Sequence, residues 1–349
     1  MTLHLWAGLI AALLLLLIGG SGALLVFEAQ IDQALNPTLS YVSPAQEPIS
    51  LKQLMGSLEE QYPGFRVFEF NISQRNDLAY TAYLESASGS GMSVAVNQYS
   101  GKSLGAWNNN RFATKLHQFH THLLMGRAGA AIVALGSGFL LVMSISGLIL
   151  WWRSKIFRIK FQSTGPKFQY DLHSSVGIAS LVFLLIFALT GLVVHWDDAL
   201  RKWALSVSDL PAQRPLAKPE HAAPGAVQLD PDQLLLRAQL AVPGARATRI
   251  DLSAGPDQPT FVTLKFPEDY TPAGRTRVVL DSYSGQVLSF TSSRAAPLAV
   301  SYTTRLNREI HTGDIGGWPT RILAAIFSLS LPLLAITGPL LWWQRRQRD

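Results

Sequence analysis

Two apolar stretches decide the fold: LHLWAGLIAALLLLLIGGSGALL at residues 3–25 and LHSSVGIASLVFLLIFALTGLVV at residues 172–194. A bilayer-spanning helix needs about 20 mainly apolar residues, and each stretch supplies that length. The stretches also resemble each other, because His4 and His173 hold the second position of each and a glycine follows four residues later. The sequence therefore predicts a membrane protein in which one kind of spanning helix occurs twice.

Two further stretches bring the number of predicted spans to four, at about Leu5–Phe27, Leu123–Trp152, Val176–Trp196 and Pro319–Trp343. The second and fourth end in Trp-Trp pairs, and tryptophan is favoured at the membrane–water interface. The first lacks the basic start and the cleavage site of a signal peptide, so it is interpreted as an anchor. The chain has no cysteine, which excludes disulfides, iron–sulfur clusters and thiol catalysis.

The charges between the spans predict the orientation, because cytoplasmic loops carry an excess of lysine and arginine. Basic residues follow the second and fourth spans: Arg153, Lys155, Arg158, Lys160, Lys167, Arg345, Arg346 and Arg348. Acidic residues follow the first and third spans: Glu28, Asp32, Asp197 and Asp198. Both termini are therefore expected in the cytoplasm and the two long segments outside it. The net charge of +6 is explained by this asymmetry, and no nucleic-acid partner is expected.

The two outer segments show the same order of elements. Ser50 and Asp230 each precede a helical pattern, and their side chains suit a helix N-cap. A Pro-Gly turn, two alternating strands and a hairpin follow in both, with Gly101 and Gly285 at the hairpin turns. Each segment is therefore predicted to be an α+β domain, with a helix on a small antiparallel sheet.

The agreement between the halves predicts an internal duplication. His120 precedes a glycine by 27 residues, and His311 does the same. Each half contains two spans, so both insert in the same direction and form a parallel repeat about a pseudo-two-fold axis. The expected fold is a four-span helical bundle with cofactor space between facing helices, plus two outer α+β domains.

The predicted segments are a first transmembrane helix (1–28), a first outer domain (29–116), a second transmembrane helix with a histidine-rich start (117–152), a basic cytoplasmic loop (153–170), a third transmembrane helix (171–197), a second outer domain (198–310), an outer connector with the fourth transmembrane helix (311–344) and a cytoplasmic tail (345–349).

Four of the eight histidines form equivalent pairs, His4 with His173 at the inner face and His120 with His311 at the outer face. Ionisable residues at a membrane span are costly and usually functional. Haem iron takes axial imidazole ligands, so each pair is predicted to clamp one haem from opposite sides. Two haems at different depths would give electrons a path across the bilayer. A zinc or copper site is the alternative, but no carboxylate or thiolate accompanies the histidines at ligand spacing.

Three other histidines, His117, His122 and His195, have no histidine at the matching position of the other half. They are candidates to flank the outer haem, bind substrate or replace a ligand. Candidate substrate residues next to the outer helix ends combine aromatic and cationic groups that suit an anionic chelate, with interfacial anchoring as the alternative: Trp107, Arg111, Tyr302, Arg305 and Trp318.

Several of these stretches together resemble the PepSY-associated transmembrane proteins. They are LHLWAGL…SGALLVFEAQIDQALNP, FHTHLLMG, DLHSSVG…TGLVV and IHTGDIGGWPTRI…ITGPLLWW. This family includes iron-regulated inner-membrane proteins and ferri-siderophore reductases of Gram-negative bacteria. The resemblance implies a bacterial inner-membrane location, two PepSY-like periplasmic domains and two b-type haems bound by His4, His120, His173 and His311.

The implied activity is haem-dependent reduction of a periplasmic ferric siderophore or similar Fe(III) chelate, with release of Fe(II), which hard oxygen ligands bind more weakly. The sequence has no nicotinamide or flavin fingerprint, so the electrons are expected from a separate cytoplasmic donor or from quinol. A PepSY-type regulatory or ligand-binding membrane protein without redox activity is the alternative. A structural scaffold whose histidines are only interfacial is a third.

Overall fold

The computed structural model describes residues 2–108, 111–155, 157, 164–207, 227–253, 255, 258–295 and 306–347. The chain divides into two compact units. A helical unit combines Met1–Ala29, Phe112–Val207 and Tyr302–Asp349, and a sheet unit combines Gln30–Arg111 and Ser208–Ser301. Each unit therefore takes segments from both halves of the chain.

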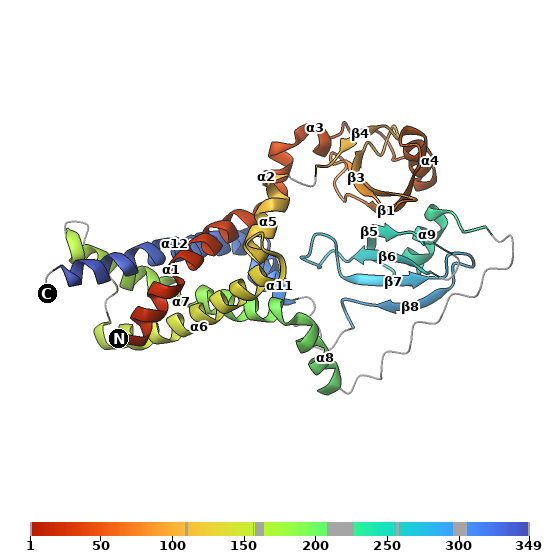
Figure 1. The fold of residues 1–349 in the computed structure, drawn as a ribbon. Helices are drawn as coiled ribbons and strands as arrows, with labels where there is room; N and C mark the ends of the chain where they lie inside the picture. The colour runs from red at the N-terminus through yellow and green to blue at the C-terminus, as the bar shows by residue number, and fades with distance from the viewer. Residues whose placement is uncertain are drawn as a thin grey trace. The chain divides into compact units, whose positions relative to one another are not determined.

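The helical unit contains four long apolar helices that lie side by side (Figure 1): α1 (Thr2–Leu25), α6 (Gly126–Ser154), α7 (Gly165–His195) and α12 (Trp318–Arg346). Each is long and apolar enough to cross a bilayer, so the chain is a multi-pass membrane protein. Helices α1 and α12 approach closely at Gly19, where a Cβ atom would lie 2.5 Å from the Cβ of Leu331. In the described part of the chain, the predicted four spans are confirmed in number and order.

The helix ends differ from the prediction. Helix α7 begins at Gly165, well before the predicted Val176, because its first turns are polar and hydropathy detects only the apolar part of a helix. The second span is preceded by a separate helix, α5 (Phe112–His122), because Leu123 and Leu124 have positive φ angles of 49° and 59° that interrupt helical geometry.

Short helices complete this unit: α8 (Asp197–Val207), α11 (Asn307–Thr312) and the 3₁₀ turn η2 (Asp314–Gly316). Helix α2 (Glu28–Leu35) starts in the helical unit, but most of it belongs to the sheet unit, which begins at Gln30. Helices α8 and α11 belong to the helical unit, although most of each falls within the second outer domain predicted from the sequence, 198–310.

The sheet unit is built on one antiparallel sheet of eight strands in the order β4-β3-β2-β1-β5-β6-β7-β8. The strands are β1 (Phe65–Asn71), β2 (Tyr80–Ser86), β3 (Gly91–Val96), β4 (Ser103–Ala106), β5 (Arg246–Asp251), β6 (Thr260–Lys265), β7 (Thr276–Leu280) and β8 (Val287–Thr291). Its helices are α3 (Pro37–Ser40), α4 (Leu51–Gln61) and α9 (Pro231–Ala241). The predicted strands and the helices after Ser50 and Asp230 are all present.

The expectation of two separate outer domains needs correction, because β1 pairs with β5 and joins both strand sets into one sheet. Phe70 and Ile250 face each other at this junction and are both fully buried in one shared core. Arg249 of β5 forms an ion pair across the junction with Glu69 of β1 at 2.8 Å, and Asp251 of its own strand holds the same guanidinium at 2.6 Å. The pairing covers two strand edges that two isolated domains would leave open.

The two strand sets repeat each other in detail. The side chains of Asn97 and Asp281 each accept the backbone N–H groups two and three residues later, at 2.8–3.3 Å. Both turns then reach a glycine with positive φ, Gly101 at 72° and Gly285 at 69°. The register irregularities in β1 and β5 also fall at matching positions.

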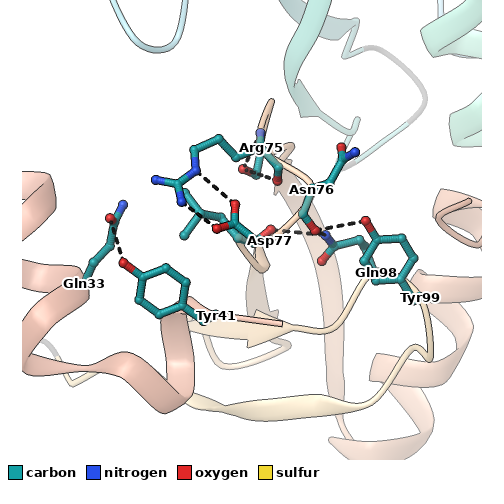
Figure 2. A network of polar contacts seen from close by, with 9 residues as sticks. Gln33, Tyr41, Arg75, Asn76, Asp77, Gln98 and Tyr99 are labelled. Atoms are coloured by element: carbon teal, nitrogen blue, oxygen red, sulfur yellow. Dashed lines mark hydrogen bonds and ion pairs between the residues drawn. The ribbon is translucent and has the colours of Figure 1, made fainter. Parts of the chain in front are cut away.

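A polar network holds the loop before β2 (Figure 2). Gln98 is buried and donates to the carbonyl of Leu78 at 3.1 Å, and Tyr99 Oη donates to the carbonyl of Asn76 at 2.9 Å. Arg75 and Asp77 close the loop with an ion pair of 2.5 Å. The loop backbone is thereby satisfied by side chains from the hairpin turn next to it.

The N-termini of helices α4 and α9 are linked by hydrogen bonds. Asp232, in the first turn of α9, accepts the backbone N–H groups of Leu51 at 2.8 Å and Lys52 at 3.0 Å. Ser50 accepts the N–H of Gln53 at 3.2 Å, so three of the first N–H groups of α4 have acceptors. This contact links an element of the first half of the chain to one of the second.

Candidate functional site

The four histidines at equivalent positions of the two halves form two pairs in the helical unit. His4 of α1 and His173 of α7 have ring centroids 6.4 Å apart and planes at 85°. His120 of α5 and His311 of α11 have centroids 6.3 Å apart and planes at 58°. All four are half-buried, and each pair joins one histidine from the first half of the chain to one from the second.

A hydroxyl group lies against each ring. In each of these four histidines, the Nδ1 atom is within hydrogen-bond distance of a serine or threonine hydroxyl on a spanning helix from the same half of the chain. The distances are 2.9 Å for His4 and Ser146, 2.8 Å for His173 and Thr337, 3.0 Å for His120 and Ser21, and 2.7 Å for His311 and Thr190.

A glycine follows each of these hydroxyl residues and leaves room for the ring. A Cβ atom on it would lie close to the Cε1 atom of the histidine: 3.3 Å at Gly147, 3.5 Å at Gly338, 3.0 Å at Gly22 and 3.8 Å at Gly191. Each ring therefore rests on a Ser-Gly or Thr-Gly dipeptide of its neighbouring helix. We call this dipeptide the ring's seat.

The two pairs lie at different levels along the bundle. Seventeen residues separate His4 from Ser21 on α1, and seventeen separate His173 from Thr190 on α7. At a rise of about 1.5 Å per residue this spacing is about 25 Å. The seats of the outer pair therefore lie about 25 Å along the same two helices that carry the inner pair.

The other three candidate histidines are exposed and occupy no seat. The Nδ1 atom of His117 lies 3.5 Å from a carboxylate oxygen of Glu28. His122 Nδ1 lies 2.6 Å from the hydroxyl of Thr121. His195 packs edge-on against Trp196, with ring centroids 4.9 Å apart. The histidines that match between the halves are thus the paired ones, and these three lie apart from both pairs.

The candidate substrate residues fall in different units. In the sheet unit, the guanidinium of Arg111 lies 4.6 Å from the ring centroid of Trp107 and forms an ion pair with Asp32 at 3.1 Å. In the helical unit, Trp318 stacks on Phe27 with centroids 6.1 Å apart. Tyr302 and Arg305 lie outside the described residues.

The hydroxyl residues were not assigned a role from the sequence, although a signal was present. A Ser-Gly or Thr-Gly dipeptide begins 17 residues after both inner histidines and 26 residues after both outer ones. The repeated spacing links each histidine to a glycine, but it does not connect the residue before that glycine to a ring. Only the packing of neighbouring helices shows which histidine each dipeptide contacts.

Comparison with known proteins agrees with this architecture. The family model of the PepSY-associated TM region matches residues 1–345. None of the curated proteins compared with the chain matches it. Because the match covers both histidine pairs, all four spans and the whole sheet, the chain belongs to the family of the PepSY-associated TM region.

Proposed function

We propose that this protein carries electrons across the bacterial inner membrane through two b-type haems and reduces a periplasmic ferric siderophore or similar Fe(III) chelate, releasing Fe(II). The observation that supports it most is the separation of the paired rings, 6.4 Å and 6.3 Å. We also infer that the chain arose by duplication, with two PepSY-like modules and the histidine pairs on a pseudo-two-fold axis.

The ring separation fits one metal ion between two imidazoles. An imidazole nitrogen binds a metal at about 2 Å, and the ring centroid lies roughly 1.2 Å behind that nitrogen, so two axial rings have centroids about 6.4 Å apart. Both pairs have this separation. Rings that only pack against each other have centroids anywhere from about 4.5 to 7 Å apart, whereas both pairs here share the distance that a metal ion between them requires.

The number of donors favours haem over a bare ion. Each pair supplies two imidazoles, and among the described residues no group of three or more histidine, cysteine, aspartate or glutamate side chains is placed to hold a metal. A protein zinc site takes three or four such ligands. Two imidazoles are sufficient as protein ligands when the porphyrin of a haem supplies the other nitrogen ligands of the iron.

Bound haem would supply one-electron chemistry at iron, with a potential set by its axial ligands, hydrogen bonds and burial. The chain contributes the imidazoles, fixes their separation and surrounds them with apolar helices. The spacing of about 25 Å along α1 and α7 nearly matches a hydrocarbon layer of about 30 Å. The pairs are therefore suited to receive electrons near one face and deliver them near the other.

The charges at the helix ends support an orientation in the membrane, and the proposed direction of transfer rests on that orientation. Arg153 lies in the last turn of α6, and Arg345 and Arg346 lie in the last turn of α12, at the ends near His4 and His173. Positive-inside asymmetry supports a cytoplasmic position for these ends and a periplasmic position for the sheet unit. A cytoplasmic donor or quinol would then supply the inner pair. The Fe(III) chelate would be reduced at the outer pair, with Trp107, Arg111 and Trp318 as candidates to bind it.

An anaerobic reoxidation experiment tests this function. Protein purified in detergent is reduced with dithionite, freed of excess reductant and mixed with a ferric trihydroxamate. We expect the reduced haem bands to disappear while an Fe(II)-specific dye captures Fe(II). The Ga(III) trihydroxamate is the control, because it has the same charge and shape but is not reduced. Purified protein without a Soret band would support the regulatory or ligand-binding alternative instead. Reduced protein that the ferric chelate does not reoxidise would reject the reductase.

A further inference from the structure

Each seat hydroxyl donates its single hydrogen to a backbone carbonyl of its own helix. The four hydroxyls donate to the carbonyl four residues earlier on their own helix: Ser21 to Leu17 at 2.8 Å, Ser146 to Val142 at 2.7 Å, Thr190 to Ile186 at 2.5 Å and Thr337 to Leu333 at 2.8 Å. Serine and threonine commonly make this bond inside helices. A hydroxyl has one hydrogen and two lone pairs, so each can only accept toward the histidine.

The histidine must then be the donor in every seat. A neutral imidazole carries its hydrogen on one nitrogen and a lone pair on the other. Since the hydroxyl accepts, Nδ1 carries the hydrogen and Nε2 keeps the lone pair. At His120 a second contact agrees, because Nδ1 also lies 3.1 Å from the carbonyl oxygen of Ile18, which can only accept.

We propose that Ser21, Ser146, Thr190 and Thr337 are positioning residues that hold the four histidines in the Nδ1–H form, so that Nε2 is the metal-binding nitrogen. This inference rests on the proposed haem function. Metal-binding histidines generally donate their other N–H to a nearby acceptor, which fixes the tautomer and raises the basicity of the ligand. Here helix hydroxyls take the place of the carboxylates and free carbonyls that usually serve.

The seat fixes the ring from two sides. The hydroxyl holds Nδ1, and the absent Cβ of the following glycine lets Cε1 approach the helix, as close as 3.0 Å from the ideal Cβ position at Gly22. The ring edge that carries Nδ1 and Cε1 is thus directed at the supporting helix. Rotation of the ring by half a turn would leave the hydroxyl without its N–H donor.

Thr190→Val is the sharpest single test. Valine has the shape of threonine but no lone pair, and the backbone carbonyl of residue 190 can still accept from Asn307, now at 3.1 Å. Losing an acceptor of this kind typically weakens metal binding about 10- to 100-fold. We expect haem retention at the outer site to fall by that factor. The haem that remains should have a higher midpoint potential, because a less basic imidazole stabilises Fe(III) less.

Two further variants separate positioning from general damage. Thr190→Ser restores the acceptor and should restore both affinity and potential. Ser180→Ala is the matched control, because Ser180 is a buried hydroxyl on the same helix that donates to Val176 at 2.7 Å and, among the described residues, has no hydrogen bond to a histidine. It should leave both haems at wild-type affinity and potential.

Redox titration and haem quantification of the full chain in detergent provide the readout. If the wild type binds two haems and Thr190→Val matches it in affinity and potential, the positioning role is wrong while the haem sites stand. If Thr190→Ser fails to restore what Thr190→Val loses, the hydroxyl is also not the cause. If the wild type binds no haem, the proposed function itself fails.

Discussion

His120 and His311 are 191 residues apart in sequence, yet their ring centroids lie 6.3 Å apart. His120 rests against Ser21 of α1 and His311 against Thr190 of α7. Each ring is therefore held by its own half of the chain, and the halves meet at the rings. His4 and His173 repeat the arrangement at the other end of the same helices. Both sites therefore form only where the two halves of the chain pair with each other.

The seats predict different tolerance to alanine at two glycines. A Cβ at Gly22 would lie 3.0 Å from the His120 ring and 3.1 Å from the Ser328 hydroxyl, whereas at Gly338 it would lie 3.5 Å from the His173 ring. We expect Gly22→Ala to lower haem content at the outer site and Gly338→Ala to leave the inner site near wild type. Haem quantification on both variants measures this, and equal losses would show that the glycines do not seat the rings.

The contact between α4 and α9 predicts a local loss of stability. Asp232→Ala removes the acceptor of two N–H groups at the start of α4. A lost helix cap costs about 0.5–2 kcal/mol, so hydrogen exchange of the Leu51 and Lys52 amides should quicken by about 2- to 30-fold. Asp232→Asn keeps an acceptor oxygen and should show a smaller change. Unaltered exchange in Asp232→Ala would mean that these amides find another acceptor.

The sheet unit should lose stability in acid through Asp230. Burial alone would raise the pKa of this carboxyl, but the backbone N–H of Asp232 and the side chain of Lys52, 3.2 Å away, outweigh it and lower the pKa. The contribution of the carboxylate is therefore complete above the ordinary aspartate pKa of about 3.9 and is lost as the pH falls through the lowered value. The Tm of the wild type should exceed that of Asp230→Asn at pH 6, with the gap shrinking below about pH 4. A gap of constant size would contradict this role.

Reporter fusions test the proposed orientation. The positive-inside asymmetry predicts that fusions after Gln30 and Asp209 report a periplasmic position and that a fusion after Asp349 reports a cytoplasmic one. Alkaline phosphatase and a fluorescent protein that fails to mature in the periplasm give opposite signals at each site. A cytoplasmic reading after Asp209 would place the third span the other way round and reject the proposed topology.

Much of the fold could be predicted from the sequence, because its signals are local. The spans follow from apolar length, and α4 and α9 follow from the caps Ser50 and Asp230. The single sheet could not be predicted, because the pairing of Phe70 with Ile250 joins strands from different halves. The repeated spacing between histidine and glycine indicates the four paired histidines. Which hydroxyl contacts each ring cannot be predicted in the same way, because it depends on how the helices pack.

The haem content of two double variants tests the central claim most directly. The pyridine haemochrome assay gives the ratio of haem to protein for the wild type, for His4→Ala with His173→Ala, and for His120→Ala with His311→Ala. Alanine offers no lone pair to iron, so we expect two haems per chain in the wild type and one, still reducible, in each double variant. Full wild-type haem content in both double variants would contradict the paired sites and move the ligands to other histidines.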